Sequence, residues 1–217
     1  MTSGAALRYW LLWLVLCAIA TGMSIAYADI PVALYLDAQV RHTQFWAGLN
    51  LALYPLPLVV IGALLFLFGC GLWLVSGRPL RPWTELPLLG SWATLWAVAA
   101  ERIFKQIFGR GWPDPTFVRD HLSGFHFLHG ETYWNSFPSG TAAISFAILA
   151  VLWMVRPAWR VGSSIIVVLI LAAVVVGNYH WLSDLIAGVF LGASIGCCTV
   201  KLLGPSRRSR ETGTNLQ

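Results

Sequence analysis

The chain has very little charge for its length. Asp, Glu, Lys and Arg make up 11% of its 217 residues, and apolar residues make up 58%. Soluble globular proteins contain about 25% charged residues, so a water-soluble globular domain is excluded. Metal-ligand spacing is also lacking, because the four cysteines all lie within apolar runs, where a thiol acts as a small hydrophobic side chain. We therefore expect neither a disulfide framework nor a metal or other cofactor.

The sequence contains several long runs of apolar residues. A membrane-spanning helix needs roughly 20 apolar residues, and several runs approach or reach that length. They are residues 9–28, 53–75, 86–100 with an extension to 108, 141–155, 163–176 and 185–203. Several of the 12 tryptophans stand near the ends of these runs, as in an interfacial aromatic belt. The sequence predicts an all-α, polytopic membrane helix bundle of about six transmembrane helices. We expect residues 1–217 to form a single domain.

The basic residues are distributed unevenly between the predicted sides of the membrane. With both termini in the cytoplasm, most of the 14 Lys and Arg residues fall on the cytoplasmic side, as the positive-inside rule expects. The net charge of +5 therefore reflects topology, and we expect no nucleic-acid partner. Four of the basic residues on the outer side fall within residues 102–119, which suggests a function. They are Arg102, Lys105, Arg110 and Arg119.

The N-terminal segment admits two interpretations. Arg8, an apolar stretch and then Ala26-Tyr27-Ala28 resemble a cleavable signal peptide. The apolar stretch is longer than the 7–15 residues usual in such peptides, so we expect a retained first span. In both cases residue 29 and its successors emerge on the outer side, where residues 29–50 are compatible with a short amphipathic helix on the membrane surface.

Two polar clusters stand at the starts of apolar runs and carry the chemistry. Phe137-Pro138-Ser139-Gly140 precedes one run, and Ser is a strong helix N-cap whose neighbouring amides can bind an anion. His180 and Asp184 precede another and share a face if their turn is helical. A carboxylate that fixes the tautomer of an imidazole leaves its other nitrogen free to attack. The pattern indicates nucleophilic catalysis on an anionic group.

A basic pair lies beside these clusters. Lys105 and Arg110 stand at and just beyond the end of the third run, next to glycine-rich turns, and both residue types bind phosphate. Lys105 is also spaced to pair with Glu101 on a helix. The long outer segment 109–137 then follows, and a loop of that length is usually functional.

The last apolar run carries glycines at every fourth position: Gly188, Gly192 and Gly196. Small residues at this spacing predict close helix packing in the last span.

Three segments together resemble the signature motifs of the type 2 phosphatidic acid phosphatase (PAP2) family of membrane lipid phosphatases. They are residues 105–113 (KQIFGRGWP), 137–142 (FPSGTA) and 177–184 (GNYHWLSD). The resemblance extends over about residues 50–205. It implies that His180 is the nucleophile and that Asp184 orients it. It also implies that Lys105, Arg110, Ser139, Gly140 and Thr141 hold the phosphate.

The chain departs from the family pattern at three places. Trp112 stands at the motif-one Arg position, which leaves Arg110 as the candidate guanidinium, and Ala173 and Val174 replace the motif-three Ser-Arg. Thr141 stands at the motif-two His position and cannot act as a general acid near neutral pH. Loss of the acid harms cleavage of a diphosphate least, because phosphate is already a good leaving group. Alternatively, His126 or His129 of the outer segment supplies the proton.

The sequence thus predicts an integral membrane phosphatase for a lipid phosphate or diphosphate, with a phosphohistidine intermediate. We expect its site on the periplasmic or extracellular side of a bacterial-type inner membrane, with membrane lipids around it. Two alternatives remain at this point. One is a lipid phosphotransferase of the same architecture, and the other is a non-catalytic protein that binds lipid phosphates.

Overall fold

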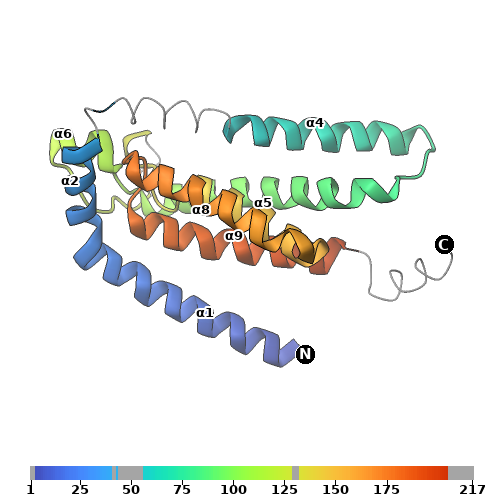
Figure 1. Ribbon diagram of the computed structural model, residues 1–217, viewed down its shortest axis with the longest axis horizontal. Helices are drawn as coiled ribbons and strands as arrows, with labels where there is room; N and C mark the ends of the chain where they lie inside the picture. The colour runs from blue at the N-terminus through green and yellow to red at the C-terminus, as the bar shows by residue number, and fades with distance from the viewer. Residues whose placement is uncertain (1–2, 41–42, 44–55, 129–131, 205–217) are drawn as a thin grey trace.

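A computed structural model describes residues 3–40, 43, 56–128 and 132–204 of the chain. The described part is helical and contains no strand (Figure 1). Its helices are α1 (Ser3–Met23), α2 (Asp29–Val40), α4 (Leu56–Val75), α5 (Glu85–Phe108), α6 (Val118–Asp120), α7 (Gly140–Val155), α8 (Arg160–Val176) and α9 (Leu182–Leu203). The prediction of an all-α bundle is confirmed.

Each of the six predicted apolar runs forms a helix, but the helices differ in how well they suit a membrane. Four are long and apolar enough to span one: Gly4–Val40, Pro57–Val75, Pro157–Val176 and Leu182–Leu203. Helix α7 has only 16 residues. Helix α5 has 24 residues but buries polar side chains near its end, Glu101 and Lys105 among them. The chain is therefore a membrane protein. Its helix α5 places polar side chains inside the helix bundle.

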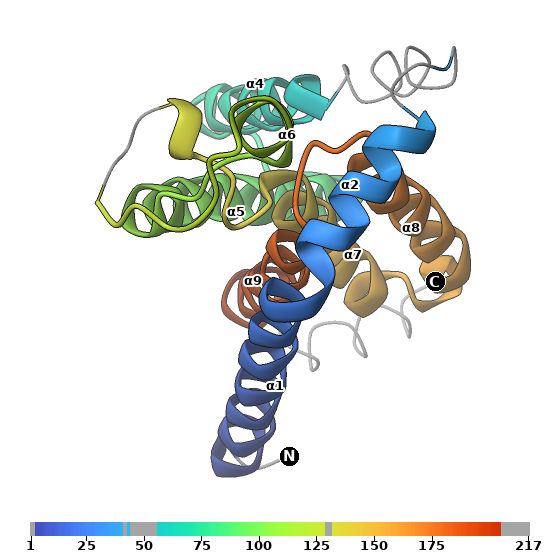
Figure 2. The same ribbon diagram turned by 90° about the vertical axis from the view of Figure 1, so that its left-hand side faces the viewer.

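Helices α1 and α2 are joined without a loop by the π-helical turn Ser24–Ala28. Viewed from one end of the bundle, α2 passes across that end while α1 runs along the side of α9 (Figure 2). Trp10 on α1 donates its indole N–H to Ser194 on α9 over 3.0 Å and contacts Phe190. The first span thus packs on the bundle. Of the segment 29–50, residues 41–42 and 44–50 lie outside the described residues.

The centre of the bundle is made by α5, α7 and α9, which pack through small side chains. Buried alanines line the contact between α5 and α7, and the three predicted packing glycines of α9 face α7. A Cβ on Gly192 would lie 2.1 Å from the carbonyl oxygen of Ala143, and one on Gly196 would lie 2.3 Å from that of Ala147. Since no side chain fits there, these glycines allow α9 to approach α7 closely.

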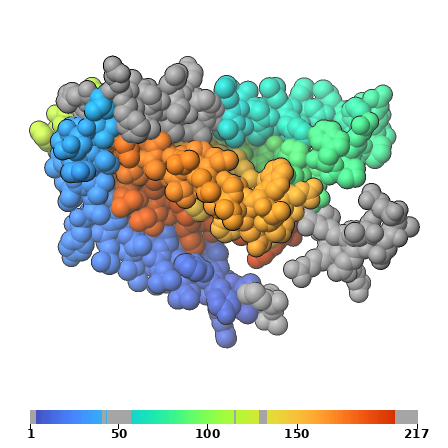
Figure 3. All heavy atoms as spheres, in the orientation of Figure 1, coloured from blue at the N-terminus to red at the C-terminus, as the bar shows by residue number. Residues whose placement is uncertain are grey.

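The remaining long helices surround this centre. Helix α4 packs on α5, α1 on α9 and α8 on α7, and α8 covers one face between α4 and α1 (Figure 3). The start of α1, the turn between α4 and α5 and the end of α9 lie toward one end of the bundle (Figure 1). The start of α7 and the start of α9, with their polar clusters, meet at the opposite end.

Candidate active site

The nucleophile candidate, His180, lies in the turn between α8 and α9 and is only 6% exposed. Asn178 shapes this turn: it adopts a left-handed conformation (φ 57°), and its side-chain amide donates to the carbonyl of Ala33 on α2 over 2.9 Å. Asn tolerates that conformation better than most residues. Helix α2 therefore supports the turn that carries His180.

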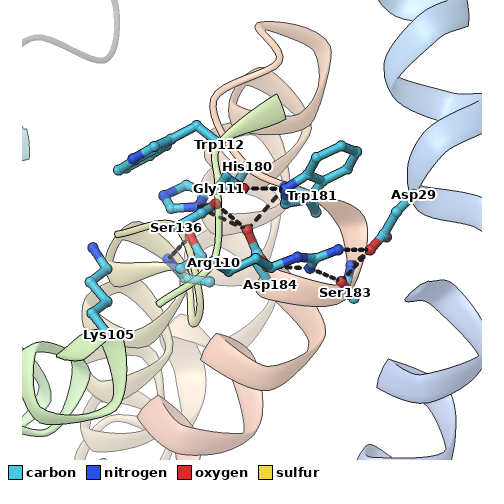
Figure 4. A network of polar contacts seen from close by, with 12 residues as sticks. Asp29, Lys105, Arg110, Gly111, Trp112, Ser136, His180, Trp181, Ser183 and Asp184 are labelled. Atoms are coloured by element: carbon cyan, nitrogen blue, oxygen red, sulfur yellow. Dashed lines mark hydrogen bonds and ion pairs between the residues drawn. The ribbon is translucent and has the colours of Figure 1, made fainter. Parts of the chain in front are cut away.

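Asp184 stands in the first turn of α9, fully buried, and its carboxylate organises the surroundings of His180 (Figure 4). One carboxylate oxygen accepts from the backbone N–H of Trp181 over 3.2 Å, which caps α9. The same oxygen accepts from the hydroxyl of Ser136. The Nδ1 atom of His180 lies 3.4 Å from this oxygen and 3.3 Å from the Ser136 hydroxyl.

This contact assigns the two nitrogens of the imidazole. With Asp184 ionised, Nδ1 carries the proton and donates toward the hydroxyl and the carboxylate, which leaves Nε2 as the basic, nucleophilic nitrogen. Burial lowers the pKa of His180 from its ordinary value, partly offset by the hydrogen bond and the charge of Asp184. The imidazole is therefore kept in its neutral form.

Arg110 forms the buried ionic centre of the site. Gly109, in a left-handed conformation (φ 51°), ends α5 and lets the chain turn so that Arg110 points inward. One terminal nitrogen of the guanidinium lies 2.6 Å from Asp184, and the other lies 2.6 Å from Asp29 at the start of α2. Ser183 joins the same network by donating its backbone N–H to Asp29 over 3.0 Å.

Arg110 thus differs from the predicted phosphate contact. Its side chain is 6% exposed, and its guanidinium bridges two carboxylates. It does not appear among the described residues that line the cavity at His180. The physical reason is that Asp29, at the start of α2, supplies a second buried carboxylate. The two terminal nitrogens of the planar guanidinium therefore each pair with one carboxylate. The structure brings Arg110 to the far side of Asp184 from the imidazole.

Lys105 and Glu101 form a second pair, one turn apart on α5. The Lys105 ammonium lies 2.8 Å from the Glu101 carboxylate, and both side chains are at least 90% buried. The i,i+4 pairing expected from the sequence is confirmed. Lys105 stands apart from the Arg110 network, with its ammonium 5.7 Å from the centre of the Trp112 ring (Figure 4).

The Phe-Pro-Ser-Gly turn begins α7 as expected. The Ser139 side chain accepts from the backbone N–H of Ala142 over 3.3 Å, so it is the N-cap. Its own backbone N–H donates to the carbonyl of Asp184 over 3.0 Å, which ties the start of α7 to the start of α9. The first amides of a helix have no partner within the helix. Gly140 and Thr141, which carry two of them, line the same cavity as His180.

This cavity has a volume of about 720 Å³ and joins a polar end to an apolar wall. The polar end contains Glu101, Arg102, Gly140, Thr141 and His180. Trp112 covers His180, with 4.8 Å between the ring centres. The apolar wall is provided by side chains of α4, α5, α7 and α8: Pro57, Val60, Ile61, Val98, Ile144 and Val174. A ligand with an anionic head and an apolar body matches that division.

The two histidines proposed as an acid are placed elsewhere or not described. His126 is exposed and its ring lies tilted against Trp134, with 3.6 Å between ring centres. It does not appear among the described cavity-lining residues. His129 lies outside the described residues.

Sequence reasoning missed Asp29, Ser136 and the position of Glu101 in the cavity. Asp29 and Ser183 are 154 residues apart, so no local pattern links them. Ser136 lies just before the recognised turn, and its backbone N–H donates to the carbonyl of Arg110 over 2.9 Å. The close spacing of Ser136 to the turn was the only local signal available.

Comparison with known proteins supports one family. The model of the PAP2 superfamily matches residues 85–208, more than half of the chain. The matched region includes Lys105, the start of α7 and the His180–Asp184 turn. No curated protein and no solved structure was found to match. Members of this family are generally phosphatases. The chain belongs to the PAP2 superfamily.

Proposed function

We propose that the protein hydrolyses a lipid phosphate or diphosphate at the outer face of the membrane, by way of a phosphohistidine on His180. The observation that carries this proposal is the buried imidazole. Its Nδ1 is engaged by Ser136 and Asp184, while the ring lines a cavity whose polar end also contains Arg102, Gly140 and Thr141. That arrangement serves nucleophilic attack on phosphorus.

In the first step, Nε2 of His180 attacks phosphorus and the bond to the leaving oxygen breaks. The imidazole becomes positively charged, and the Asp184 carboxylate stabilises that charge through Nδ1–H. Water then attacks the phosphohistidine, the P–N bond breaks, and the electron pair returns to the imidazole. The amides of Gly140 and Thr141 hold the phosphoryl oxygens, and Ser139 fixes the amides as N-cap of α7. Lys105 adds a positive charge next to Glu101 and Trp112, two residues that line the cavity.

In this proposal Arg110 acts on the nucleophile through Asp184. Its bond to one oxygen of Asp184 leaves the other oxygen to face Ser136 and His180. A positioned carboxylate keeps the imidazole in one tautomer and one orientation. We therefore assign Arg110 as a positioning residue, held in turn by Asp29.

A lipid substrate is favoured by the apolar wall of the cavity. Ile61 on α4 is 51% exposed on the membrane-facing side of the bundle and also lines the cavity. An acyl or prenyl chain could extend from the phosphate along this wall into the bilayer. The outer-side placement is supported by the start of α1, the α4–α5 turn and the α7–α8 turn, which lie at the opposite end of the bundle from the start of α9 (Figure 1). These segments carry the basic residues Arg8, Arg78, Arg156 and Arg160.

The proposal is tested with purified protein against long-chain phosphate monoesters and diphosphates in detergent, in the presence of EDTA. We expect release of inorganic phosphate from at least one class, with the dephosphorylated lipid on thin-layer chromatography. Transfer of the phosphoryl group to an added lipid alcohol would indicate the phosphotransferase. Saturable binding with no turnover of any substrate would contradict the proposal and favour a non-catalytic protein.

Blocking the apolar wall should discriminate between substrates by chain length. Ile144 on α7 is half-buried and lines the cavity, so Ile144→Trp fills space that a chain would occupy. We expect KM for a long-chain phosphate to rise about tenfold, since an apolar pocket distinguishes such groups by about 1–3 kcal/mol. The KM for a short-chain analogue should change little. An equal rise in KM for both substrates would mean that the alkyl chain of the substrate binds outside this cavity.

The protonation of His180 should follow its burial. Because burial lowers the pKa of the imidazole, His180 remains neutral, and therefore nucleophilic, at pH values where an ordinary histidine with pKa 6.5 is half protonated. Nitrogen NMR of histidine-labelled protein measures this, with His180 assigned by the missing signals of His180→Ala. A midpoint below 6.5 is expected, and a midpoint above it would mean that Asp184 outweighs burial.

A further inference from the structure

We propose that Glu101 is the general acid and base of the reaction, in place of the imidazole that the motif-two position lacks. The inference rests on the proposed phosphatase function and adds to it the residue that protonates the leaving oxygen. Thr141 at the motif-two position cannot do so near neutral pH. Among the described residues that line the polar end of the cavity, Glu101 carries the carboxyl group.

The burial of Glu101 is the first observation. The side chain is 7% exposed, although it lies near the C-terminal end of a helix in a membrane protein. Burying a carboxylate there is costly, and ionisable groups inside membranes generally have a function. Pairing with Lys105 lowers that cost, but it does not explain why the carboxyl group faces the cavity rather than the surface.

The position of the carboxyl group relative to α7 is the second observation. A Cβ built on Gly140 would lie 3.1 Å from Oε2 of Glu101 and 3.4 Å from Oε1. The carboxyl group therefore occupies the space that a side chain at residue 140 would take. Thr141, where the family places its acid, is the next residue. Both Glu101 and Thr141 line the cavity, so Glu101 enters from α5 the cavity that a histidine at position 141 would enter from α7.

The bonding of the carboxyl group is the third observation. Oε2 is fully buried and accepts no well-aligned hydrogen bond from the described residues, although the Lys105 ammonium lies 2.8 Å away. The other carboxylate oxygen, Oε1, lies 3.4 Å from Nε of the exposed Arg102. A phosphate dianion that binds at the α7 N-terminus adds two negative charges, so three negative charges face these two cations. A proton held between the carboxyl group and the phosphate reduces the repulsion between them. A protonated carboxyl group beside the phosphate is a proton donor.

The proton balance over the cycle is complete. As His180 displaces the leaving oxygen, the Glu101 carboxyl proton passes to that oxygen, and an alcohol leaves together with a Glu101 carboxylate. The carboxylate then takes a proton from the water that attacks the phosphohistidine. Breaking the P–N bond returns the imidazole to its neutral form, phosphate departs, and Glu101 is protonated again. No additional reactant is required.

The test compares two substrates that carry the same alkyl chain but differ in their leaving group. One is an alkyl phosphate, whose alkoxide leaves poorly, and the other is a nitrophenyl phosphate, whose phenoxide leaves well. Glu101→Gln keeps the size of the side chain and removes the acid. We expect kcat for the alkyl phosphate to fall about 10²–10⁴-fold. The fall for the nitrophenyl phosphate should be at least tenfold smaller.

Two further variants complete the design. Glu101→Gln/Thr141→His places an imidazole at the motif-two position and should recover part of the lost activity toward the alkyl phosphate. Glu85→Gln makes the same chemical change at the opposite end of α5 and should leave the ratio of the two rates unchanged. The elution volume and thermal midpoint in detergent check that each variant is folded.

The outcomes separate this inference from the function on which it rests. An equal loss on both substrates, without recovery by Thr141→His, would overturn the assignment and leave Glu101 as a partner of Lys105. In that case the phosphatase proposal stands, because the nitrophenyl phosphate is still cleaved by the wild type. If the wild type cleaves a lipid diphosphate but neither of these substrates, the inference is overturned and the phosphatase proposal stands. Failure of the wild type to cleave either substrate or any lipid diphosphate would overturn the phosphatase proposal itself, and the inference with it.

Discussion

His180→Ala is expected to lower turnover by about 10³-fold or more, because the variant lacks the atom that forms the covalent bond to phosphorus. The imidazole is buried and its Nδ1 is already engaged by Ser136 and Asp184. No neighbouring group described at the polar end of the cavity offers an equivalent nucleophile. The measurement is phosphate release from the best lipid substrate at saturating concentration.

His121→Ala provides the matched control. His121 is exposed in the segment after α6, away from the cavity-lining residues, and its removal should change turnover less than twofold. If His180→Ala retains more than about a tenth of the wild-type rate, His180 is not the nucleophile.

Arg110→Ala is expected to have the largest effect on stability. The change leaves Asp29 and Asp184 without their shared counter-charge, and these side chains are 1% and 0% exposed. Removing one partner of a buried ion pair typically costs about 3–5 kcal/mol. Activity should also fall, since Asp184 would lose the bond that positions it. Unfolding in mixed detergent micelles measures the change in free energy.

Two companion variants identify the cause. Arg110→Lys retains the charge but not the planar fork that reaches two carboxylates, so it should recover only part of the stability. Asp29→Asn combined with Arg110→Ala removes one of the stranded charges. The double variant should therefore be less unstable than the sum of the two single changes. A loss below about 1 kcal/mol for Arg110→Ala would mean that solvent reaches the carboxylates and that the network is not structural.

Features set by short-range spacing could be predicted from the sequence. The apolar runs predicted the helices, and Ser139 caps α7 as its residue type suggests. Lys105 pairs with Glu101 because residues four apart on a helix are neighbours. The pairing of Asp184 with His180 has the same origin, since both stand in one turn at the start of α9.

Features that depend on tertiary contact could not be predicted in this way. Arg110 is a suitable phosphate ligand by residue type. It pairs with carboxylates instead because α2 packs so that Asp29 contacts its guanidinium. Ser136 gains its role because the segment before α7 is held against Arg110. Glu101 was recognised as the partner of Lys105, but its place beside Gly140 depends on the close packing of α5 on α7.

The central claim is that His180 carries the phosphoryl group between two displacements. Rapid quenching of the enzyme during turnover of a ³²P-labelled lipid phosphate in alkali, followed by peptide mapping, tests it most directly. The account predicts an alkali-stable, acid-labile label on the peptide that contains His180, and no label in His180→Ala. Label on another residue would contradict it, as would inversion of configuration at phosphorus with a chiral substrate, because two displacements give retention.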